Sequence, residues 1–120
     1  MAMISSSDEF SLLLNKWNSE SKELFMIGVV KEDDQAAYCV LVVIGRIVEL
    51  DEEHLCILSD SGASGIIRYR GRQCVYEEKF RAPAGHLANR TFEDVFVFDV
   101  PRTSFSIAIG ATSLASESSD

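Results

Sequence analysis

The longest β-type segment of this sequence runs from Ala36 to Leu50, is rich in valine and isoleucine, and holds Gly45 in its interior. Branched side chains fit the pleated surface of a sheet, so this composition favours a strand. Strands of this length seldom stay flat, and a glycine inside one usually marks a bend, a bulge or a close backbone contact. We therefore predict one long strand that bends at Gly45 and serves two sides of a strongly bent sheet or small barrel.

Further strand signals surround this segment and make the expected fold mainly β. Glycines, serines and acidic residues separate the runs, as is typical of turns. The last two runs flank Pro101 and alternate apolar with polar residues, which predicts an extra C-terminal hairpin with one buried face. The expected strands are Leu24 to Val30, His54 to Leu58, Ile66 to Arg70, Gln73 to Phe80, Asp94 to Val100 and Ser104 to Ile109.

An amphipathic helix is expected near the N-terminus. Ser6 and Glu9 have the spacing of a capping box, in which each side chain bonds the main-chain amide of the other residue. The following apolar residues recur at helical spacing and form one stripe. The stripe either packs on the chain's own sheet or meets a partner in a groove. Its members are Phe10, Leu13, Leu14 and Trp17.

The 120 residues are the usual size of one domain, and we expect a single globular domain over residues 1–111. Residues 112–120 are small, polar and acidic, which predicts a disordered tail. The three cysteines, Cys39, Cys56 and Cys74, lie in apolar stretches without a CxxC pair. They indicate buried reduced thiols, with a thiol activated by His86 as the alternative.

The net charge is −8, and the excess of acids lies in the first half of the chain, where 12 acidic residues face 4 basic ones. Such a charge repels phosphate backbones and anionic lipid, so nucleic-acid binding would have to be local. The first residues resemble no secretory signal, and no apolar run is long enough to span a bilayer. We expect a cytoplasmic protein that does not enter membranes.

Two short stretches resemble the signature motifs of the Sm-like proteins. The segment from Gly45 to Leu58 matches the first motif at six positions, and Tyr69 to Val75 looks like the second. Over residues 10–80 the resemblance implies a helix followed by a small five-stranded barrel that assembles through its edge strands and binds RNA. Leu55 stands where the family has the asparagine that contacts bases, so that contact is lost here. The six matching positions are Gly45, Ile47, Leu50, Asp51, Cys56 and Leu58.

Three arginines, Arg68, Arg70 and Arg72, are spaced by two residues. On one continuous strand they would project from the same face and could clamp a phosphate or a carboxylate. The alternative is a solvated face that pairs with Glu77 and Glu78 across a hairpin.

No pattern in the sequence points to catalysis. Asp51 to His54 carries carboxylates and an imidazole but reads as a charged turn, and we expect no metal and no cofactor. The leading hypothesis is a non-enzymatic binding or assembly module that self-associates. The alternatives are nucleic-acid or nucleotide binding through the arginines, and a small-molecule-binding protein or enzyme with a pocket under the helix.

Overall fold

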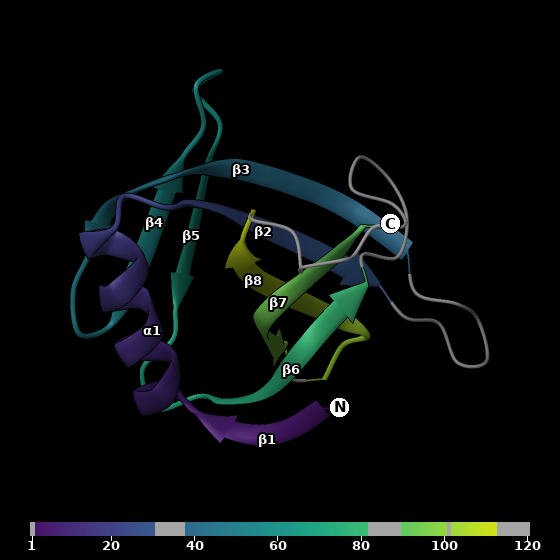
Figure 1. The fold of residues 1–120 in the computed structure, drawn as a ribbon. Coiled ribbons are helices and arrows are strands. Elements are labelled where there is room, and N and C mark those ends of the chain that lie inside the picture. The colour runs from purple at the N-terminus through teal and green to yellow at the C-terminus, as the bar shows by residue number, and fades with distance from the viewer. Residues whose placement is uncertain (1, 31–37, 82–89, 101, 113–120) are drawn as a thin grey trace, which may run out of the picture.

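The structure is a computed structural model that describes residues 2–30, 38–81, 90–100 and 102–112. Within these ranges one helix and eight strands confirm a mainly β fold (Figure 1). In chain order the elements are β1 (Ala2–Ser6), α1 (Ser7–Ser19), β2 (Glu23–Val30), β3 (Tyr38–Leu50), β4 (His54–Leu58), β5 (Ser64–Arg68), β6 (Gln73–Arg81), β7 (Thr91–Asp99) and β8 (Phe105–Ala111).

The helix α1 begins where the capping residues predict. Ser6 is extended, and its hydroxyl accepts a hydrogen bond from the amide of Glu9 at 3.5 Å. The reciprocal bond of the capping box does not form, because the Glu9 carboxylate accepts from the hydroxyl of Ser5 instead. Phe10, Leu14 and Trp17 are buried. The Phe10 ring packs against the rings of Tyr69 and Phe96. The apolar stripe thus packs within the chain, which decides between the two alternatives.

All eight strands belong to one antiparallel sheet in the order β1-β6-β7-β8-β2-β3-β4-β5. Figure 1 shows this sheet strongly curled, with α1 lying beside β4 and β5. The first and last strands of the order, β1 and β5, do not pair with each other among the described residues. β1 and β5 are therefore the two end strands of this order, and each has one edge without a partner strand among the described residues.

The long strand β3 changes partners near Gly45. Residues 38–46 pair with β2, and residues 46–50 pair with β4. A Cβ atom on Gly45 would lie 2.1 Å from the carbonyl oxygen of Leu58 and 2.7 Å from the amide nitrogen of Ser59. Glycine is needed here because the backbone leaving β4 approaches too closely for any side chain. Of the three features that such a glycine can mark, the structure shows the close backbone contact.

The strands near the C-terminus lie at the centre of the sheet and are not an addition to its edge. β7 and β8 pair with each other, and β8 also pairs with β2. Both strands contribute side chains to two apolar clusters, so the expectation of a single buried face is wrong. The amide of Thr112 donates to the carbonyl of Glu23 at 3.0 Å, so the first residue of the predicted tail belongs to the fold. Residues 82–89 and 113–120 lie outside the described part of the chain.

Apolar side chains gather in two clusters on opposite faces of the central strands. Leu24 and Met26 of β2 join the cluster under α1, whereas Phe25 and Ile27 join the second cluster. Burial on both faces explains why β2 reads as a continuous apolar run without alternation. Among the described residues, no helix is both long enough and apolar enough to cross a membrane.

Candidate binding surfaces

The three arginines do not lie on one strand. β5 ends at Arg68, and the chain then turns through residues 70 and 71, where Gly71 has φ +75°. A positive φ is readily adopted by glycine and ends the extended backbone that the shared face would require. The expectation of three guanidinium groups projecting from one strand face is therefore wrong.

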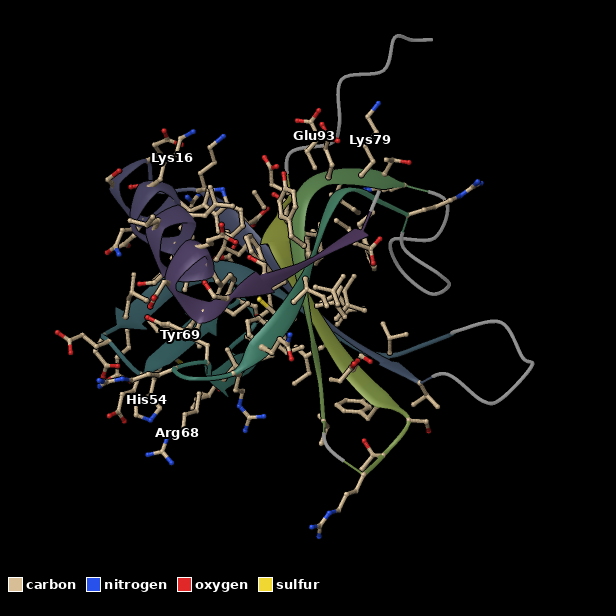
Figure 2. All side chains as sticks on the ribbon, turned by 90° about the horizontal axis from the view of Figure 1, so that it is seen from below. Lys16, His54, Arg68, Tyr69, Lys79 and Glu93 are labelled. Atoms are coloured by element: carbon tan, nitrogen blue, oxygen red, sulfur yellow. The ribbon has the colours of Figure 1, made fainter. Side chains whose placement is uncertain are left out.

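Two of the guanidinium groups instead converge on Glu53, which precedes β4. Arg68 Nη2 lies 3.7 Å from Glu53 Oε1, and Arg70 Nη1 lies 3.6 Å from Glu53 Oε2. Arg72 donates from Nε to the carbonyl of Arg68 at 2.8 Å. Figure 2 shows Arg68 pointing away from the sheet, on the same side as His54. All three arginine side chains are exposed. Solvent therefore screens the two ion pairs with Glu53, and they contribute little stability.

The turn from Asp51 to His54 is held by its own main chain. Asp51 Oδ1 accepts hydrogen bonds from the amides of Glu53 and His54, both at 2.7 Å. These two bonds, assisted by His54 at 3.4 Å, lower the pKa of the Asp51 carboxyl below its usual value. In the part of the chain that the structure describes, no three His, Cys, Asp or Glu side chains are placed to hold a metal ion.

An exposed apolar face lies beside the outer edge of β5. Cys56 of β4 pairs with Ile66 of β5, so their side chains share one face of the sheet. Ile66 is 65% exposed, and Leu58, two residues after Cys56, is 42% exposed. On β3 a register shift between Ile47 and Glu49 leaves Val48 58% exposed. We call the outward face formed by Val48, Cys56, Leu58 and Ile66 the β5 face.

Sequence reasoning missed the β5 face. Its residues carry the ordinary apolar pattern of strands, and that pattern does not tell which face is covered. The only available signal was the shortness of the segment around Ile66, since edge strands are often short.

The two cysteines whose side chains are described differ in access. Cys74 is buried, whereas Cys56 is partly exposed on the β5 face. Burial, with a smaller contribution from the charge of Glu9, raises the pKa of the Cys74 thiol to about 11. A protonated, buried thiol is a poor nucleophile, so Cys74 does not fit a catalytic role. His86, the residue that could activate a thiol, lies outside the described residues.

Comparisons with known proteins identify no relative of this chain. No protein-family model, no curated protein and no solved structure matches it.

Proposed function

We propose that this chain is a non-enzymatic assembly module of small-barrel type that self-associates through the β5 face. The observation that carries the proposal is an exposed apolar row that crosses three strands and ends at an unpaired strand edge. Contiguous exposed apolar surface beside an open edge favours pairing with another chain. The Sm-like resemblance of residues 45–58 supports the same class of function.

A second copy of the chain fits this edge by symmetry. If two β5 strands pair antiparallel about Ile66, that residue meets its own copy, and Arg68 lies opposite Ser64. The two Arg68 side chains then stay at opposite ends, so no like charges meet directly. Closed two-fold contacts of this kind are the most common arrangement of soluble homo-oligomers.

The charge of the chain predicts how association responds to salt. Each copy carries a net charge of −8, so two copies repel each other at low ionic strength. Salt screens this repulsion and leaves the burial of apolar side chains in place. Association should therefore strengthen between low and physiological salt.

Size-exclusion chromatography with light scattering across the micromolar range tests the proposal. We expect an oligomer for the native chain and a monomer for Ile66→Lys, which places a charge in the centre of the contact. Leu12→Lys is the matched control, because Leu12 is 74% exposed on α1 and lies outside the β5 face. A native chain that stays monomeric, or an Ile66→Lys chain that still associates, would contradict the proposal.

A second candidate function is anion or nucleic-acid binding through Arg68, Arg70 and Arg72. It is favoured by the convergence of two guanidinium groups on one carboxylate, since an external phosphate could take the place of Glu53. Binding of a short labelled RNA should weaken steeply with salt. Arg70→Ala should reduce it, whereas Arg90→Ala, which removes an equal charge elsewhere on the surface, should not. Equal affinity for both variants would exclude this function.

A further inference from the structure

A groove separates α1 from the edge of the sheet formed by β1, β6 and β7. One part of it, about 430 Å³, is lined by Ile4 and Ser5 of β1 together with side chains of the other elements. An adjoining part, about 360 Å³, reaches Lys16 at the far end. The two parts share four lining residues, so they form one continuous depression, which we call the α1 groove. The shared residues are Glu9, Leu12, Tyr76 and Phe96.

The size and walls of the α1 groove suit a small organic molecule. The volume of each part lies in the range of small-molecule sites. Such sites are lined mainly by apolar and aromatic side chains with a few polar groups. Ile4 and Leu12 are 76% and 74% exposed, the highest values among the large exposed apolar residues of the described chain. The ring centres of Tyr76 and Phe96 lie 5.2 Å apart, and both residues line the groove, Phe96 with 3% of its surface exposed.

Two carboxylates give the groove its charge. Glu9 accepts a hydrogen bond from Ser5, and Asp94 accepts one from the hydroxyl of Tyr76. Each of these bonds uses one carboxylate oxygen, and within the described residues the second oxygen of each group has no donor. A carboxylate can accept several hydrogen bonds, so both groups retain acceptor capacity toward a ligand.

Tyr76 keeps its proton at neutral pH and donates it in a hydrogen bond to Asp94. Its hydrogen bond to Asp94, with burial and the charges of Asp94, Glu78 and Glu93, raises the pKa of Tyr76 to about 12. Among the described residues that line the groove, Lys16 is the one cation, and it is exposed at the far end. Figure 2 shows Lys16 and Glu93 on the same side of the molecule, on α1 and β7.

The backbone conformation of Asp94 brings its carboxylate to the α1 groove. Asp94 has φ +57°, a left-handed conformation that aspartate adopts more readily than most residues. The alternation of β7 changes phase there, because Phe92 faces the second cluster whereas Phe96 faces the cluster under α1. The same local kink therefore brings Asp94 to Tyr76 and Phe96 to the floor of the groove.

We propose that the α1 groove binds an apolar molecule that carries one positive charge, such as an aryl- or alkylammonium compound. The apolar part would lie against Leu12, Ile4 and the ring of Phe96. The ammonium group would donate to Glu9 and Asp94 and lie near the face of Tyr76, an arrangement that combines charge-assisted hydrogen bonds with a cation–π contact. The proposal does not depend on self-association, since the groove and the β5 face share no residue.

A matched set of three probes tests the charge preference: phenylbutylamine, phenylbutanol and phenylbutyrate. They have nearly the same apolar part and differ in charge. Titration followed by amide chemical shifts should show the amine binding about fivefold or more tighter than the alcohol, with the anion weakest. The shifts should map to α1, β6 and β7, and added salt should reduce the preference for the amine.

Variants then assign the preference to the two carboxylates. Glu9→Gln combined with Asp94→Asn removes both charges, and asparagine tolerates the left-handed backbone at this position. This chain should bind amine and alcohol equally. Glu49→Gln, an exposed position on β3, is the control and should keep the preference. The proposal is overturned if the amine shows no saturable binding at millimolar concentration, if the three probes bind alike, or if the double variant retains the native preference.

Discussion

The hydroxyl of Tyr69 donates a hydrogen bond to the main-chain carbonyl of Asp51, which lies 18 residues earlier in the chain. The Tyr69 amide also donates, to the carbonyl of Glu53 at 2.9 Å. The same residue thus fastens the segment after β5 to the turn before β4. Its ring is 2% exposed and meets Phe10 of α1 edge to face, at 5.4 Å between ring centres.

Removal of this hydroxyl should destabilise the fold. Tyr69→Phe keeps the ring contact but leaves the Asp51 carbonyl without its partner, so we expect the free energy of unfolding in urea to fall by about 1 kcal/mol. Tyr76→Phe is the comparison, because its hydroxyl bonds a half-exposed carboxylate, and its effect should be smaller. A larger loss for Tyr76→Phe than for Tyr69→Phe would contradict this account.

Gly45→Ala should be among the most damaging single substitutions in the sheet. The new methyl group would meet the main chain at Leu58, which cannot move aside as a flexible side chain could. We expect a loss of roughly 2–4 kcal/mol in the free energy of unfolding. Gly62→Ala is a control with open space around it but a positive φ of +97°, and it should cost about 1–2 kcal/mol. Equal losses for the two variants would show that β3 and β4 can separate at this point.

Stability should depend on the charge of Asp51 in acid. Its pKa is lowered in the folded state, so between that value and the ordinary 3.8 the unfolded chain binds more protons than the folded chain. The contribution is complete above pH 3.8 and is lost as the pH falls through the folded-state value. Asp51→Asn can still accept the two amide hydrogen bonds but does not titrate. Urea unfolding between pH 7 and pH 3 should therefore show a shallower acid loss for this variant, and an unchanged acid slope would refute the assignment.

The Cys74 thiol should be inert in the folded protein. Its burial and its pKa of about 11 leave little thiolate at neutral pH. A chain with Cys39→Ser and Cys56→Ser, in which Cys74 is the only thiol, should react with a thiol reagent only as fast as it unfolds. The same chain in urea should react promptly. Prompt reaction under native conditions would mean that the segment around Cys74 opens locally.

Features set by neighbouring residues could be predicted from the sequence, and features set by distant pairing could not. The capping serine and the apolar spacing fixed α1, and Gly45 marked the place where β3 changes partners. The strand β1 carries no such local signal, since its residues become a strand only by pairing with β6, about 70 positions later. Long-range pairing of this kind is decided by the whole fold rather than by propensity.

The candidate sites show the same limit. Arg68, Arg70 and Arg72 have the spacing of one strand face, and the sequence around Gly71 does not decide whether the strand continues or turns. The β5 face and the α1 groove depend on which side of each strand stays uncovered, and this is decided by the strand order of the sheet. The resemblance of residues 45–58 and 69–75 to the Sm-like proteins stays a prediction from the sequence.

Three adjacent strands, β7, β8 and β2, supply side chains to both apolar clusters. Unfolding of either cluster would expose to solvent one face of strands whose other face is still packed in the second cluster. The two clusters should thus behave as one cooperative unit that melts in a single transition. The strands at the two ends of the sheet are free of that double constraint, and β1 and β5 can therefore fray, and change in sequence, at far lower cost than the centre.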